Sequence, residues 1–222
     1  MKALCTGILM LLLGGLAAAG QSSQGQTAAP SLDEQVFRAI ENADSAALAQ
    51  LLAQGARVDA QNDHGYTPLM AAVGLGHTEM VKLLLDHGAN PALSDKTGRT
   101  ALHYAAMTGN LEAAKLLLDK TAPVNAKDND GFTPLMYSIV SHNLELVNLL
   151  LDKGADVEAH DPRGFTPLMA AAGGGFADIV KTLLDHGAGV NDKSHDGTTA
   201  LKLATGSNHT GVADLLRAKG AQ

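Results

Sequence analysis

One hexapeptide recurs along this chain at a fixed spacing. It reads Gly-Tyr-Thr-Pro-Leu-Met at residues 65–70 and Gly-Phe-Thr-Pro-Leu-Met at residues 131–136 and 164–169. Weaker copies begin at Gly98 and Gly197, so all five copies start at one constant interval without an insertion or deletion. A fixed period of this length indicates stacked supersecondary units, each of which buries its apolar face against its neighbours. The repeat therefore predicts an elongated solenoid.

The composition is typical of thin, closely stacked helices. Of the 222 residues, 45% are hydrophobic, but only 3% are aromatic and tryptophan is absent. The formal net charge is -7, and no run rich in Lys and Arg occurs. Because neutralising phosphates requires clustered basic side chains, this balance argues against nucleic acid as a partner.

Residues 1–19 have the pattern of a secretory signal peptide. Lys2 supplies a short positive region, residues 3–16 are apolar, and three alanines form a small-residue cleavage site, so we expect cleavage near Ala19/Gly20. The apolar run is too short for a membrane span. Cys5, the single cysteine, would leave with this segment. We therefore expect a periplasmic or secreted protein without a membrane anchor after cleavage, with a retained N-terminal anchor as the alternative.

A flexible linker is predicted for residues 20–30, which are rich in Gln, Ser and Ala. Ser31 and Glu34 then have the spacing of a capping box, which predicts the start of a helix. A second helix is expected from about residue 44 to residue 53. The segment 31–63 lacks the hexapeptide and is predicted to be an N-terminal cap.

Four complete units are predicted to follow the cap, and a shorter C-terminal cap completes the series. Each Thr-Pro-Leu predicts a short helix, with Thr as N-cap and Pro at the first helical position. A second apolar helix and an extended return stretch complete each unit. The units span residues 64–96, 97–129, 130–162 and 163–195, and the C-terminal cap spans residues 196–222.

The whole pattern, from Asp-x-x-Gly-x-Thr-Pro-Leu-His through Gly-Ala-x-Val-Asn-Ala, resembles the ankyrin repeat over residues 31–222. The resemblance implies an all-α solenoid of helix-turn-helix repeats with protruding β-turn fingers. It also implies a non-catalytic protein-protein interaction module, usually monomeric. In the family, the His of the hexapeptide ties neighbouring turns together, and here only His103 keeps it. Methionines replace the others, so we expect less rigid turns there.

Thr121 is a second departure from the family pattern. It replaces the glycine that ends the second helix in the other units. Because a β-branched residue is costly in the left-handed conformation, we predict a different helix end before Pro123.

Sequence patterns of catalysis are lacking: there is no Gly-x-Ser-x-Gly, Walker loop or His-Glu-x-x-His. We expect neither an enzyme nor a cofactor. His87 and His186 are expected to meet the last carbonyls of their helices. A metal site needs three or four converging ligands, whereas the other histidines are spread along the stack, so none is expected. Metal binding through the rows of His or of Met70, Met136 and Met169 remains an alternative.

The most informative candidates for partner binding follow the repeat glycines. Aromatic residues and Arg recur there and on two of the first helices, and these residue types dominate hot spots of protein interfaces. The predicted partner-binding stripe consists of Tyr66, Arg99, Tyr104, Phe132, Tyr137 and Phe165. The alternative is that these rings pack against the next finger and only stiffen the stack.

The sequence therefore favours a periplasmic or secreted adaptor, or accessory factor, that binds a protein partner on its finger surface. An exported effector or inhibitor that acts on a host or secreted protein is the second hypothesis. A metal-binding protein is the third.

Overall fold

The computed structural model describes residues 29–222. The predicted signal peptide and all but the last two residues of the predicted linker lie outside the described residues. Within residues 29–222 the chain forms twelve helices in consecutive pairs and no strand beyond an isolated bridge between Ser94 and Thr100. The predicted all-α stack of paired helices is confirmed.

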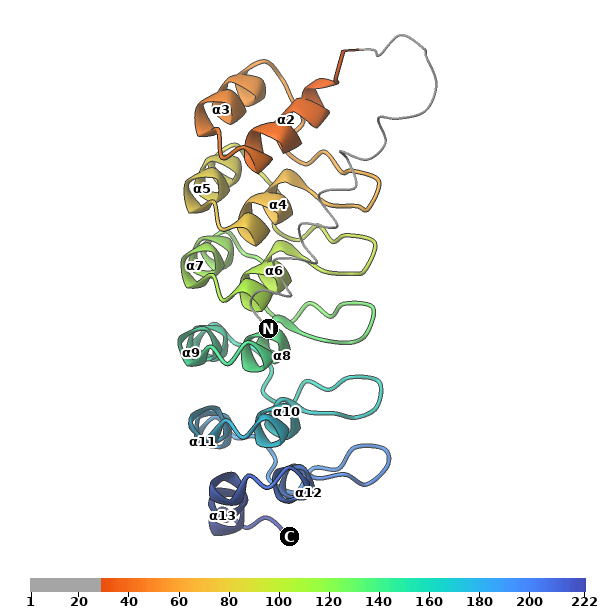
Figure 1. Ribbon diagram of the computed structural model, residues 1–222, viewed down its shortest axis with the longest axis vertical. Coiled ribbons are helices and arrows are strands. Elements are labelled where there is room, and N and C mark those ends of the chain that lie inside the picture. Colours follow the sequence, from red (N-terminus) through yellow and green to blue (C-terminus); the bar gives the residue numbers. More distant parts are fainter. Residues whose placement is uncertain (1–28) are drawn as a thin grey trace.

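The helices form two columns (Figure 1). The first helix of each pair, called an inner helix here, lies next to the loops that project to one side. The inner helices are α2 (Leu32–Glu41), α4 (Pro68–Leu75), α6 (Ala101–Thr108), α8 (Pro134–Val140), α10 (Pro167–Gly174) and α12 (Ala200–Gly206). The outer helices are α3 (Ser45–Ala53), α5 (Thr78–Asp86), α7 (Leu111–Asp119), α9 (Leu144–Asp152), α11 (Ala177–Asp185) and α13 (Thr210–Ala218).

The starts of the inner helices follow the capping rules. The Ser31 hydroxyl accepts from the Glu34 N–H, and the Glu34 carboxylate accepts from the Ser31 N–H, so the predicted capping box is confirmed. Threonine side chains accept from a backbone N–H three residues on, and proline occupies the first turn, in α4, α8 and α10. These caps satisfy donors that a helix start leaves free.

Gly65 explains why the hexapeptide begins with glycine. Its φ is 80°, in the left-handed region. A Cβ at this position would lie 2.9 Å from the backbone N of Lys96 and 3.1 Å from Cα of Asp95, both in the next loop. Any larger residue would therefore be strained and would also push the neighbouring unit away.

The prediction of a different helix end at Thr121 was wrong. Thr121 has a φ of 61° and keeps the turn that Gly88 makes. Its N–H donates to the carbonyl of Leu118, and the Ala122 N–H donates to the carbonyl of Leu117 at 3.0 Å. Leu117 and Ala122 are buried, so packing on both sides of the turn fixes the backbone despite the local penalty.

Replacing Thr121 with glycine is expected to raise the free energy of unfolding by about 1 kcal/mol, because glycine removes the strain of a β-branched residue in the left-handed conformation. Urea unfolding followed by circular dichroism measures the change. The matched control is Thr182→Gly within α11, where the same substitution should destabilise by a few tenths of a kcal/mol, because glycine is a poorer helix former than threonine. A destabilised Thr121→Gly variant would contradict the idea that this position is strained.

The core runs through the whole stack between the two columns. Leu69, Leu102, Leu135 and Leu168 occupy the same position of successive units and are at most 1% exposed. Each inner helix contacts the inner helix before and after it, as α8 contacts α6 and α10. Stability therefore rests on contacts between neighbouring units.

Candidate protein-binding surface

The projecting loops, called fingers here, are each folded around a polar side chain. The fingers are residues 62–66, 95–99, 128–132, 161–165 and 194–198. In the second finger, Asp95 Oδ1 accepts from the N–H groups of Thr97 at 2.8 Å and Arg99 at 3.0 Å. Asp128 repeats this pattern in the third finger. Such side-chain-to-backbone turns fix the finger locally.

Backbone hydrogen bonds also join the first finger to the second, the second to the third, and the fourth to the fifth. The Lys96 N–H donates to the His64 carbonyl at 3.0 Å, and the Asn129 N–H donates to the Thr97 carbonyl at 2.9 Å. The last two fingers are joined in the same way by the His195 N–H. The fingers therefore stack beside the inner helices (Figure 1).

The second oxygen, Oδ2, of Asp95 and of Asp128 connects each finger to the inner helix that follows it. Asp95 Oδ2 accepts from the Tyr104 hydroxyl, and Asp128 Oδ2 accepts from the Tyr137 hydroxyl at 2.7 Å. Arg99 Nε also donates to Asp128 at 3.4 Å, which joins the second finger to the third. Burial raises the pKa of both tyrosine hydroxyls well above the ordinary value, so they remain protonated donors.

Two of the six predicted partner-binding residues lie in the interior. Tyr66 and Tyr104 are each 3% exposed, and their ring centroids are 5.1 Å apart. Burial raises the pKa of the Tyr66 hydroxyl to about 12. A protein docked on the surface would contact neither ring, so their placement matches the alternative in which the rings pack within the stack.

The other four predicted residues are partly exposed, and three of them, Arg99, Phe132 and Tyr137, lie next to one another. Arg99 Nε donates to the Tyr137 hydroxyl at 3.1 Å, and the guanidinium lies 5.5 Å from the Tyr137 ring centroid. The Phe132 and Tyr137 ring centroids are 5.7 Å apart. Phe165 lies beneath the guanidinium of Arg163 at 5.6 Å. Partner binding remains a prediction for Arg99, Phe132, Tyr137 and Phe165.

Two apolar residues on the inner helices were missed by the sequence reasoning. Val140 is 46% exposed, and Met107, at the same position of the preceding unit, is partly exposed. They lie one helical turn after Tyr137 and Tyr104, on the same side of their helices. The sequence feature that could have revealed Met107 and Val140 is a large apolar residue at a repeat position that Gly173 occupies in the next unit. We call this surface the inner face, and it consists of Arg99, Met107, Phe132, Tyr137, Val140, Phe165, Ala170 and Gly173.

Arg163 holds the fourth finger in shape. Its Nε and Nη2 groups donate to Asp161 Oδ2 at 2.9 and 2.7 Å. Burial would raise the pKa of the Asp161 carboxyl, but the Phe165 N–H and the Arg163 guanidinium outweigh it and hold the pKa below its ordinary range. The carboxylate is thus kept charged at the base of the finger.

His103 links two neighbouring units, as the family resemblance implies. The Thr100 N–H donates to Nδ1 at 3.0 Å, which makes Nδ1 an acceptor. Nε2 then carries the proton and donates to the Phe132 carbonyl at 3.1 Å. The side chain is fully buried, and burial lowers the pKa of the imidazole. A second proton, on Nδ1, would point at the Thr100 N–H, so that two donors would face each other without an acceptor.

This arrangement predicts that acidification destabilises the fold through His103. Above the ordinary histidine pKa of about 6.5 the ring is neutral in both states. Below it the unfolded chain takes up a proton before the folded chain does, so stability falls by at most about 1.4 kcal/mol per pH unit. His103→Met, which copies the neighbouring units, should show a shallower loss between pH 7.5 and 5.5 in urea unfolding. Parallel curves for the two proteins would rule out this role.

Two further histidines and the row of methionines lie at the positions expected for structural contacts. Nδ1 of His87 lies 2.8 Å from the Leu83 carbonyl, and Nδ1 of His186 lies 2.8 Å from the Thr182 carbonyl, which confirms the predicted contacts at helix ends. The row of Met70, Met136 and Met169 is buried. In the part of the chain that the structure describes, no three His, Cys, Asp or Glu side chains are grouped to hold a metal ion.

A surface groove of about 410 Å³ lies where the last two fingers meet the body of the stack. Glu158 and Asp192 line it together with His160, Lys193 and His195. Glu158 Oε1 accepts from the Gly189 N–H at 2.6 Å. Burial and then the neighbouring Asp192 carboxyl raise the pKa of Glu158.

Among residues 29–222, no helix is long and apolar enough to cross a membrane.

Comparison with known proteins identifies one family. The family described as ankyrin repeats (3 copies) matches residues 36–128, 90–161 and 157–222. Over 66 residues the chain is also 35% identical to "Ankyrin repeat, SAM and basic leucine zipper domain-containing protein 1" of Notamacropus eugenii. That match covers 30% of this chain and only 14% of that protein.

Proposed function

The chain belongs to the ankyrin-repeat family, and we propose that it is an exported adaptor that binds a protein partner through the inner face. Ankyrin repeats generally serve protein-protein interaction and are typically non-catalytic. The observation that carries the proposal is the cluster of partly exposed Arg99, Phe132 and Tyr137, in which the Arg99 guanidinium and the Phe132 ring both lie against Tyr137. The partly exposed Phe165 occupies the position of Phe132 in the next finger. Aromatic residues and Arg supply most of the binding energy in protein interfaces.

The construction of the fingers supports binding by a preformed surface. Buried carboxylates fix the second and third turns, and backbone hydrogen bonds join three of the four pairs of neighbouring fingers. A partner would therefore not have to order these loops, which lowers the entropic cost of association.

The sequence of residues 1–19 supports export, and we propose the periplasm as the setting. Mass spectrometry of the native protein should find a mature chain that begins near Gly20. Fractionation should place it in the periplasm. An uncleaved chain in the membrane fraction would contradict both parts of the proposal, and accumulation outside the cell would favour the exported effector.

Affinity purification from the native compartment tests the adaptor function. A double variant, Phe132→Ala with Phe165→Ala, should lose a partner that the unsubstituted protein retains. The matched control is Lys115→Ala with Glu145→Ala on the outer helices, both exposed, and it should keep the partner. Circular dichroism verifies folding of all three proteins. Equal retention by the double variant would place the site off the inner face.

A further inference from the structure

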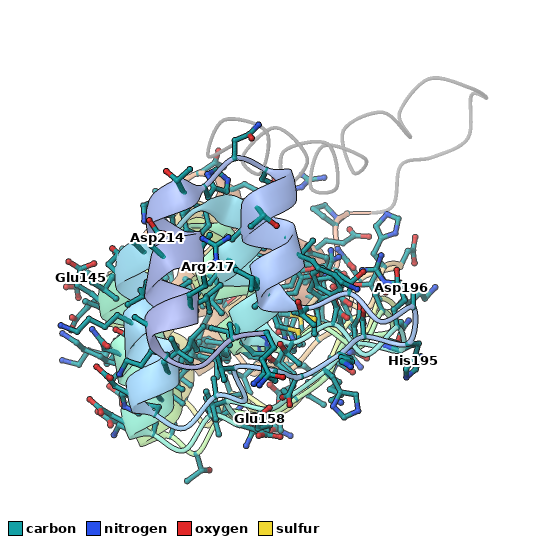
Figure 2. The ribbon with its side chains drawn as sticks, turned by 90° about the horizontal axis from the view of Figure 1, so that it is seen from below. Glu145, Glu158, His195, Asp196, Asp214 and Arg217 are labelled. Carbon is teal, nitrogen blue, oxygen red and sulfur yellow. The ribbon has the colours of Figure 1, made fainter. Side chains whose placement is uncertain are left out.

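The tips of the five fingers, which are the two residues before each repeat glycine, carry one formal charge each, and the sign alternates along the stack. The charged tip residues are Asp63, Lys96, Asp130, Arg163 and Asp196, and all are exposed. Asp63 and Lys96 stand two residues before the glycine, and the other three stand directly before it. Figure 2 shows Asp196 and its neighbour His195 at the outer end of the last finger, on the opposite side from Glu145 of the outer column. Of these five residues only Arg163 forms an ion pair within residues 29–222, with Asp161 of its own finger, and its side chain is still 74% exposed.

The spacing of the tip charges restricts what can pair with all of them. Packed helices lie about 8–10 Å apart, so neighbouring tips recur about every 10 Å. An α-helix rises about 1.5 Å per residue, so seven residues cover about 10.5 Å in nearly two full turns. Charges seven residues apart therefore point the same way. In a β-strand about three residues cover this distance, and successive charges would point to opposite faces.

The inner face beside the tips adds a second requirement. Val140, Phe132 and Phe165 offer apolar area, while Ala170 and Gly173 leave room for a wide element to approach. A partner must hence present a charged row toward the tips and an apolar row toward the inner helices. An amphipathic helix has both rows side by side. A polyproline helix also repeats about every 9.3 Å, but with three residues per turn it turns only one row toward the stack.

We propose that the inner face receives an amphipathic helix of the partner, which lies along the stack and carries charges of alternating sign at seven-residue spacing. Acidic residues of this helix pair with Lys96 and Arg163. Basic residues pair with Asp63, Asp130 and Asp196. The proposal rests on the proposed function and specifies the chemistry of the partner.

Two synthetic helical peptides of about 28 residues, four heptads, test the proposal. Both carry the same apolar face and the same composition. One places Glu, Lys, Glu and Lys at successive heptads, and the other places Glu, Glu, Lys and Lys. Fluorescence anisotropy with the full-length protein should give at least a tenfold lower Kd for the alternating peptide. Equal Kd values, or binding of neither peptide, would overturn the proposal.

A charge variant tests whether the tips cause the discrimination. Lys96→Glu makes the first three tips acidic, and the two peptides should then bind with Kd values within about threefold of each other. Lys82→Glu makes the same charge change on an exposed position of an outer helix and should keep the tenfold difference. Persistent discrimination by the tip variant, shown to be folded by circular dichroism, would overturn the proposal.

The affinity purification separates this inference from the proposed function. A native partner that depends on Phe132 and Phe165, together with no discrimination between the peptides, would refute the alternating helix alone. Loss of both results would refute the inner face as a binding site.

Discussion

Replacing Leu135 with alanine is expected to lower the free energy of unfolding by about 2–5 kcal/mol. Leu135 is 1% exposed and belongs to α8, which packs against both α6 and α10. Truncation removes buried methyl groups and leaves a cavity that the surrounding helices fill only in part. Because the stability of a repeat stack is a sum over neighbouring interfaces, a defect in a central unit also weakens the coupling between the two ends.

Urea unfolding measures this effect through the midpoint and the slope m. The control is Val140→Ala in the same helix, where a side chain 46% exposed should cost less than about 0.5 kcal/mol. Similar losses in the two variants would mean that Leu135 does not occupy the core. A lower m for Leu135→Ala would indicate that the two ends have begun to unfold separately.

The Asp128→Ala substitution is expected to cost about 3 kcal/mol, because it leaves several buried partners of one carboxylate unpaired. The side chain is 1% exposed, and it accepts from two backbone N–H groups, the Tyr137 hydroxyl and Arg99. Removal therefore loosens the third finger, its inner helix and the neighbouring second finger together.

Asp130→Ala provides the control for Asp128→Ala, since Asp130 lies in the same finger but is exposed and forms no ion pair within residues 29–222. Its loss should change the free energy of unfolding by less than about 0.5 kcal/mol. Comparable effects of the two substitutions, measured by urea unfolding, would show that the buried carboxylate does not hold the finger.

The sequence allowed the fold to be predicted because period, caps and apolar pattern all agree. It could not separate the buried from the exposed members of the predicted stripe, because exposure depends on a residue of the next unit. Tyr66 faces Tyr104 and is covered. Phe132 occupies the same hexapeptide position, but the residue that corresponds to Tyr104 is Ala170, which is too small to cover it, and Phe132 stays partly exposed.

Thr121 shows the opposite limit of local reasoning. The residue is unsuited to its backbone conformation, yet the buried neighbours Leu117 and Ala122 impose the turn. Tertiary packing here outweighs a local preference of roughly 1–2 kcal/mol, so a rule based on one residue type gave the wrong helix end.

Within residues 29–222 the bonds between fingers and helices run only from one unit to the next, so the units are connected mechanically in series. A force applied between the two ends of this described part is carried by each contact between neighbouring units in turn. Stretching a single molecule should consequently release the units one after another. Each step would lengthen the chain by up to about 110 Å, the extended length of one unit.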